Sequence, residues 1–222
     1  MEATTTLFIK TPRTARVAVL GELNDQVEEC WIVMHGYRQL ASRFLRRFQP
    51  FAAEKRVIVA PEGLSRFYLY DQRPHVGASW MTREDRLHEI EDQFQYLENL
   101  YQHLKDQLSP EVKWHLFGFS QGVATVWRWL LKGSIAPRSL TICCGIVPME
   151  SNDLLESKLK ALPLCNVFAL QDEFIPLEKA NEHAENVAKT YPQTQNLGVD
   201  GPHELHAEMM QIWMAQFASH LV

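Results

Sequence analysis

Apolar and polar positions along the chain alternate between the short period of strands and the longer period of helices. Five short runs are almost wholly apolar, as strands covered on both faces of a parallel sheet are. These runs are residues 30–34, 56–60, 113–117, 140–144 and 166–170. Residues 5–10 and 15–20 predict an entry hairpin, and residues 194–199 predict a last, short strand.

Longer segments between these runs repeat their apolar residues every three or four positions, which is the period of a helix. Residues 84–108 and 204–221 each carry one apolar stripe that we interpret as facing the core, and residues 121–132 predict a helix directly after a strand. The alternation predicts an α/β fold with a mostly parallel sheet of about seven or eight strands and helices on both faces. No repeat or linker interrupts residues 1–222, so we expect a single domain.

Composition and charge exclude several classes of protein. The 222 residues carry a net charge of −5, and no block of Lys and Arg indicates a nucleic-acid partner. No apolar run approaches the roughly 20 residues that a membrane-spanning helix needs. The first residues lack the pattern of a secretory signal, and none of the four cysteines has metal-ligand spacing. We therefore expect a cytoplasmic protein with buried, reduced thiols and no metal.

The motif Gly-Phe-Ser-Gln-Gly at residues 118–122 is the strongest candidate for chemistry. It lies between a predicted strand and a predicted helix, where a sharp turn lifts a serine side chain above the edge of a sheet. Gly118 and Gly122 allow the close backbone approach that such a turn needs. Ser120 is therefore the candidate nucleophile, at a helix N-terminus that favours developing negative charge. The alternative is a helix cap flanked by glycines.

A serine hydroxyl needs a base, and the base needs an acid that orients it. After a serine at such a turn, the acid and then the histidine follow along the chain. His203 lies in a turn-forming segment after the last predicted strand and is the candidate base, with His206 as the alternative. Asp172 directly follows the strand at 166–170 and is the candidate acid, with Glu173 and Asp153 as alternatives.

The other histidines after Ser120 fit less well, since His183 lies in a charged helical run and His220 is near the C-terminus. An oxyanion hole needs two N–H donors. One is expected from Gln121, which follows the nucleophile. The other is expected from Tyr37, in the loop after the strand at 30–34. We interpret His35 as support for this loop rather than as the base.

Four segments in this order resemble the phospholipase/carboxylesterase family of α/β-hydrolases, which includes the acyl-protein thioesterases. They are Met-His-Gly-Tyr at 34–37, Gly-Phe-Ser-Gln-Gly at 118–122, Asp-Glu-Phe-Ile-Pro at 172–176 and Gly-Pro-His-Glu at 201–204. Residues 60–63 and 77–80 also look like this family's pattern. The resemblance implies a triad of Ser120, Asp172 and His203, oxyanion donors at Tyr37 and Gln121, and no metal or cofactor. Phe168-Ala169, Val123 and Arg38-Gln39 depart from the family's usual residues and leave the substrate open.

The expected activity is hydrolysis of carboxylic esters of small or acyl-chain substrates through an acyl-enzyme. Thioesterase or lysophospholipase activity on the same triad is an alternative, and a non-catalytic binding protein is another. The segment between the strands at 140–144 and 166–170 is too short for a large lid domain, so we expect a shallow, open site. Four apolar side chains have two possible locations: they line a groove for an apolar acyl chain, or they belong to the core. They are Trp80, Met81, Met149 and Phe174. The sequence leaves a monomer or a homodimer equally open.

Overall fold

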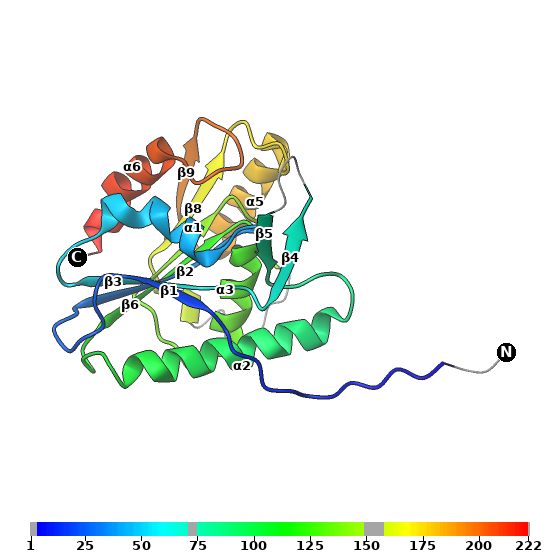
Figure 1. Ribbon diagram of the computed structural model, residues 1–222. Coiled ribbons are helices and arrows are strands. Elements are labelled where there is room, and N and C mark those ends of the chain that lie inside the picture. Colours follow the sequence, from blue (N-terminus) through cyan, green and yellow to red (C-terminus); the bar gives the residue numbers. More distant parts are fainter. Residues whose placement is uncertain (1–3, 71–74, 149–157, 222) are drawn as a thin grey trace.

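A seven-stranded sheet forms the centre of the protein in a computed structural model, which describes residues 4–70, 75–148 and 158–221 (Figure 1). Its strand order is β1-β3-β2-β6-β7-β8-β9, and only β1 runs antiparallel to its neighbour. The strands are β1 (Val17–Leu20), β2 (Glu29–Met34), β3 (Arg56–Pro61), β6 (Lys113–Phe119), β7 (Ser139–Cys143), β8 (Leu164–Ala169) and β9 (Gln195–Val199). This arrangement confirms the predicted mostly parallel sheet.

Helices cover both faces of the sheet (Figure 1), as the sequence predicted. One face packs against α2 (Arg86–Lys105), α3 (Gln121–Lys132) and α5 (Leu177–Thr190). The other packs against α1 (Ala41–Leu45), the 3-10 helix η1 (Arg46–Phe51), α6 (Ala207–Gln216) and the 3-10 helix η2 (Ala218–His220). Successive β2 side chains point to opposite faces, so Ile32 and Val33 belong to different clusters of the core. A strand buried on both faces needs the continuous apolar run seen in its sequence.

One segment differs from its prediction. Residues 5–10 form no strand but lie in an extended arm that leaves the body of the molecule (Figure 1). Leu7 and Ile9 there are 80% and 83% exposed, since no neighbouring strand pairs with the arm. Between β3 and α2, β4 (Ser65–Leu69) and β5 (His75–Ser79) form a separate two-stranded sheet.

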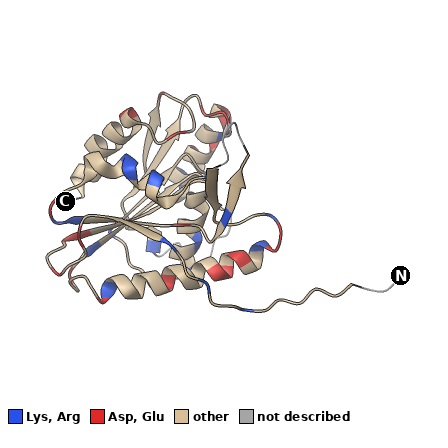
Figure 2. Cartoon of the chain, in the orientation of Figure 1, with Lys and Arg blue, Asp and Glu red and all other residues tan. Residues whose placement is uncertain are grey.

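The parallel strands end at one edge of the sheet, so the loops that follow β2, β6, β7, β8 and β9 meet there. This edge carries Ser120, Asp172 and His203, the candidate catalytic residues described below. The described residues contain no large lid domain, and none of their helices is long and apolar enough to cross a membrane. Acidic and basic residues are interspersed over the helices on both faces of the sheet (Figure 2).

Candidate active site

Ser120 sits at the sharp turn between β6 and α3, in a backbone conformation with a positive φ of 53° and a ψ of −118°. Such a conformation is strained for a residue with a side chain, and the surrounding contacts hold it in place. The Ser120 N–H donates to the carbonyl of Cys143 at 2.9 Å. A Cβ on Gly122 would lie 2.3 Å from the Met34 carbonyl oxygen, so only glycine lets α3 begin this close to β2.

The structure brings together the three side chains that the sequence singled out. His203 Nε2 lies 2.8 Å from Ser120 Oγ, and His203 Nδ1 lies 2.6 Å from Asp172 Oδ2. The Asp172 carboxylate is 2% exposed and the His203 imidazole 10%. An ionised carboxylate only accepts hydrogen bonds, so the proton of the neutral ring is on Nδ1 and the Nε2 lone pair faces the hydroxyl.

Hydrogen bonds to the Asp172 carboxylate and to the His203 backbone hold these two residues in position. Asp172 Oδ1 accepts hydrogen bonds from the N–H groups of Phe174 and Ile175, both at 2.8 Å. The Glu173 carboxylate accepts from the His203 N–H at 2.9 Å, and this bond lowers the pKa of Glu173 below its usual value. Glu173, an alternative acid from the sequence, therefore contacts the backbone of His203 and not its ring. The other alternative, Asp153, lies outside the described residues.

The loop after β2 approaches the nucleophile closely. A Cβ on Gly36 would lie 3.1 Å from Ser120 Cβ, which puts the backbone of this loop beside the serine. The Tyr37 ring is half exposed and stacks on Phe67 at 5.4 Å. Among the described residues, none accepts a hydrogen bond from the Tyr37 N–H. Gln121 is the first residue of α3, so its N–H has no partner within the helix.

His35 lies buried beneath this loop and supports it. Its Nδ1 donates to the Gly36 carbonyl at 2.7 Å, and its Nε2 accepts from the Gly63 N–H at 3.0 Å. The ring stacks on Trp80 at 5.0 Å. Burial lowers the pKa of His35 to about 4, against a smaller opposing effect of the Gly36 hydrogen bond. His35 is thus a neutral scaffold residue near neutral pH, in agreement with its interpretation from the sequence.

The Gln121 side chain, at the start of α3, forms hydrogen bonds with the backbone of the segment after β5. Its Oε1 accepts from the Trp80 N–H at 2.9 Å, and its Nε2 donates to the Met81 carbonyl at 2.7 Å. Trp80 itself is 1% exposed, and its indole N–H donates to the His35 carbonyl at 2.8 Å. Trp80 therefore supports the site from within the core, so of the two alternatives that the sequence left open for this residue the structure favours the core over an acyl groove.

The other predicted groove residues have different environments. Phe174 is 73% exposed, and its ring meets the His203 ring edge-on at 5.0 Å. Phe119 contacts the same imidazole at 5.3 Å. Met81 is half-buried, and Met149 lies outside the described residues. An aromatic residue next to His203, the candidate base, therefore leaves an apolar surface open at the mouth of the site.

The remaining histidine candidates have structural contacts. His206 caps α6, where its Nδ1 accepts from the Met209 N–H at 3.3 Å, so it does not face Ser120. His183 is half-buried in α5 and accepts a hydrogen bond from the Val147 N–H at 3.1 Å. Burial lowers its pKa. His220 is exposed in η2.

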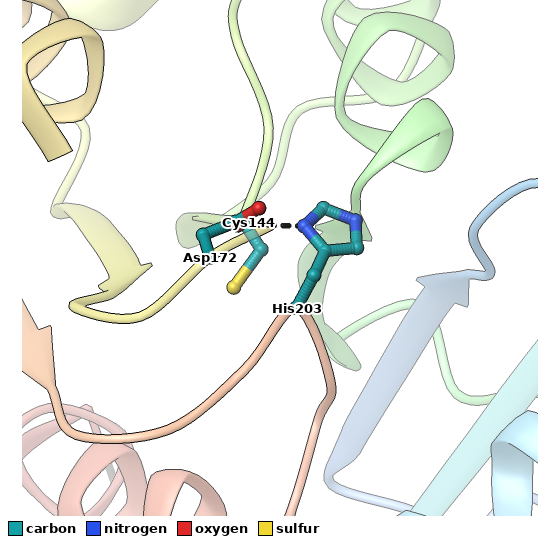
Figure 3. A group of neighbouring side chains, drawn as sticks. All are labelled: Cys144, Asp172 and His203. Atoms are coloured by element: carbon teal, nitrogen blue, oxygen red, sulfur yellow. Dashed lines mark hydrogen bonds and ion pairs between the residues drawn. The ribbon is translucent and has the colours of Figure 1, made fainter. Parts of the chain in front are cut away.

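Cys144 is a neighbour of Asp172 and His203 that the sequence did not single out. Its thiol, one carboxylate oxygen of Asp172 and one ring nitrogen of His203 all lie within 4.8 Å of one another (Figure 3). The sequence places Cys144 at the end of a strand, but only the sheet order reveals that this strand lies between β6 and β8. The group is the one set of candidate metal ligands found among the described residues.

Several solved structures share this fold. Acyl-protein thioesterase 2 from Zea mays is 12% identical, with a TM-score of 0.69 over 94% of this chain and 100% of that chain. Esterase PE8 is 17% identical, with a TM-score of 0.69 over 95% and 100%. A phospholipase/carboxylesterase from Dyadobacter fermentans is 12% identical, with a TM-score of 0.66 over 93% and 98%. Identities this low establish the fold alone.

No curated protein sequence matches the chain. The model of one protein family, described as phospholipase/carboxylesterase, matches residues 19–221, which is nearly the whole length. The α/β-hydrolase fold of its structural neighbours agrees with this match. The resemblance carried by the four sequence segments is thereby confirmed. The chain belongs to the phospholipase/carboxylesterase family of hydrolases.

Proposed function

We propose that this protein is a serine hydrolase that cleaves carboxylic esters through an acyl-enzyme on Ser120. The observation that carries the proposal is the continuous hydrogen-bonded chain from Ser120 Oγ through both ring nitrogens of His203 to Asp172. A chain in this order is what removal of a hydroxyl proton requires, because the base must touch the nucleophile and the acid must orient the base.

The first half of the reaction forms the acyl-enzyme. Ser120 Oγ attacks the ester carbonyl carbon while His203 Nε2 accepts the hydroxyl proton. Asp172 stabilises the imidazolium that results, and its two backbone hydrogen bonds keep its carboxylate in place. The imidazolium then returns its proton to the departing alcohol as the carbon–oxygen bond breaks. In the second half, water attacks the acyl-enzyme by the same route and releases the acid.

The tetrahedral intermediate carries a negative oxygen that needs fixed donors. We assign this role to the backbone N–H groups of Tyr37 and Gln121. The close approach of Gly36 to Ser120 supports the first assignment, and the position of Gln121 at the first turn of α3 supports the second. The N-terminal end of α3 adds its favourable potential for an anion.

The acyl group is proposed to lie on the apolar surface beside His203. Phe174 is exposed there, with 73% of its surface accessible, and its ring contacts the His203 ring. Ile146, in the loop after β7, is 46% exposed and lines a pocket together with Asp172 and Ile175. Met81 follows Trp80 in the chain and is half-buried. Met149 is retained as a predicted contact. An open apolar surface of this kind suits an acyl chain of a small-molecule ester. The triad itself does not distinguish an oxygen ester from a thioester, which differ in their leaving group.

The test is hydrolysis of p-nitrophenyl acetate by purified wild type and Ser120→Ala. The variant should lose about 10⁴-fold or more in kcat, because removal of the nucleophile disables the whole triad. Ser42→Ala is the matched control, since Ser42 is an exposed serine in α1 outside the site. A fluorophosphonate probe should label wild type and Ser42→Ala but not Ser120→Ala. Equal turnover by Ser120→Ala and wild type contradicts the proposal.

The substrate class is tested with p-nitrophenyl esters from acetyl to palmitoyl, together with a thioester and a lysophospholipid. We expect turnover of the oxygen esters. Labelling of Ser120 without turnover of any p-nitrophenyl ester, but with turnover of the thioester or the lysophospholipid, assigns the triad to that substrate instead. A protein that neither reacts with the probe nor hydrolyses any member of the set is a non-catalytic binding protein.

A further inference from the structure

Three potential metal ligands meet where adjacent strands of the sheet end. Cys144 follows β7, Asp172 follows β8 and His203 follows β9, and these strands are neighbours in the sheet. Their ligand atoms lie within 4.8 Å of one another, and Figure 3 shows the thiol beside the hydrogen-bonded Asp172–His203 pair. Cys144 is 1% exposed, so its sulfur is enclosed with the two triad residues rather than free at the surface.

The Cys144 thiol takes no part in the proton path described above. The Cys144 sulfur contacts two other sulfur atoms, Cys143 Sγ at 3.9 Å and Met209 Sδ at 4.0 Å. The backbone of Cys144 is held at φ 46°, and its N–H donates to the Val167 carbonyl at 2.8 Å. Because φ lies in the left-handed region, this position favours glycine on backbone grounds, yet it carries a thiol next to the triad.

We propose that Cys144, Asp172 and His203 form an inhibitory site for a thiophilic divalent cation, of which Zn²⁺ is the probe. The inhibitory part of this inference rests on the esterase activity proposed above. The ligand set is one that zinc accepts, because thiolate, imidazole and carboxylate are its three common protein ligands. Three protein ligands leave a fourth position of the tetrahedron for water.

Charge balance favours this set in an enclosed site. Binding forms a Zn–S bond as the S–H bond of Cys144 breaks, and the thiol proton passes to solvent. The thiolate and the Asp172 carboxylate then neutralise the two positive charges of the cation, with a neutral His203 as third ligand. Without the thiolate, one positive charge would stay uncompensated in a largely buried site, which is costly. Cys144 is therefore the residue that makes binding possible.

Inhibition follows from which ring nitrogen the cation occupies. In the metal-free protein the ring proton is on Nδ1, which faces Asp172, and the Nε2 lone pair faces Ser120. A cation bound at Nδ1 takes the lone pair there, so the ring proton moves through solvent exchange to Nε2. The ring then presents N–H instead of a lone pair to Ser120 and no longer acts as the base. Zinc thus lowers kcat without occupying the substrate surface.

Binding also requires local rearrangement. Zinc bonds of about 2.3 Å to sulfur and about 2.0–2.2 Å to nitrogen and oxygen place tetrahedral ligands about 3.3–3.7 Å apart. The 2.6 Å contact between His203 and Asp172 must open to that separation, and the thiol must move closer. Since all three side chains are largely buried, inhibition is expected to develop slowly after mixing and to reverse with a chelator. Mg²⁺, which prefers oxygen ligands and an octahedral arrangement, is expected to have no effect.

The test compares zinc inhibition of p-nitrophenyl acetate hydrolysis by chelator-treated wild type, Cys144→Ser and Cys144→Ala. Each activity is expressed relative to the same protein without metal, and the fold of each variant is checked by circular dichroism. Loss of a ligand should raise the half-inhibitory zinc concentration about tenfold or more, because even indirect support of a metal site contributes 10–100-fold. Cys30→Ser is the matched control, since this buried cysteine lies in β2 outside the ligand group. Equal zinc sensitivity of wild type and both Cys144 variants overturns the proposal.

A second readout is independent of activity. Cobalt(II) bound through a thiolate gives a charge-transfer absorption that oxygen and nitrogen ligands alone do not produce. Ser120→Ala retains all three ligands and should show this absorption, whereas the double variant Ser120→Ala/Cys144→Ser should not. If no ester is hydrolysed, the proposed function fails but cobalt absorption that depends on Cys144 still supports the site. Absence of this absorption in Ser120→Ala overturns the site whatever the activity.

Discussion

Acid stability of the fold depends in part on His115, a histidine remote from the active site. It is fully buried in β6, where Nδ1 lies 2.8 Å from Ser139 Oγ and the ring stacks on Trp31 at 4.3 Å. Among the described residues, none hydrogen-bonds to its Nε2. Burial lowers the pKa of His115 to about 4; Glu29 opposes the shift, and Arg56 is the first of the cations that reinforce it.

This shift makes the unfolding free energy depend on pH. An unfolded histidine has a pKa of about 6.5, so between pH 6.5 and 4 the unfolded chain binds a proton that the folded chain excludes. Stability from this group is complete above pH 6.5 and is lost as pH falls toward 4. The full loss is about 3 kcal/mol, of which about 2 kcal/mol falls between pH 7 and 4.5.

The perturbation is His115→Gln, which keeps a polar group for Ser139 but has no proton to gain. At pH 7 the variant should be about 1–2 kcal/mol less stable than wild type, through imperfect hydrogen bonding and packing. Urea unfolding followed by tryptophan fluorescence at pH 7, 6, 5 and 4.5 measures both curves. The variant should lose about 2 kcal/mol less than wild type over this range. His220→Gln, at an exposed histidine, is the control. Parallel curves for wild type and His115→Gln would show that folded and unfolded His115 do not differ in proton binding over this range.

Three further substitutions test the site. Gly122→Ala puts a Cβ 2.3 Å from the Met34 carbonyl oxygen. Urea unfolding should therefore show a loss of about 3 kcal/mol or more in unfolding free energy, and esterase activity should fall. Unchanged stability contradicts the close approach of α3 to β2 at this residue. Trp80→Phe removes the donor to the buried His35 carbonyl and should cost about 1–3 kcal/mol in unfolding free energy, whereas a neutral effect argues against that bond. Phe174→Ala should lower kcat/KM for p-nitrophenyl octanoate more than for the acetate, and equal decreases would remove Phe174 from the acyl surface.

Local features of the chain predicted most of the secondary structure. The helix expected at 121–132 is α3, and the strand expected at 113–117 begins at the same residue as β6. Both segments are rich in apolar residues, and they meet at the glycine-flanked turn at 118–122. These signals depend only on residues close together in the sequence. The arm at 5–10 has the residue types of a strand but lacks a partner, and a single strand without a partner makes no ladder. Pairing is a long-range property, and the residue types of the segment did not reveal its absence.

Residue types, local periodicity and the order of the motifs along the chain were enough to predict the family, the α/β architecture and the three side chains that form the hydrogen-bonded chain. The packing of the folded chain was needed to establish that Trp80 is buried, that Glu173 contacts the His203 backbone and that Cys144 lies beside Asp172 and His203. Each of these depends on which strands are neighbours and how their loops meet. Strand order in the sheet departs from order in the sequence, so apolar periodicity assigns a residue to a face but not to its neighbours.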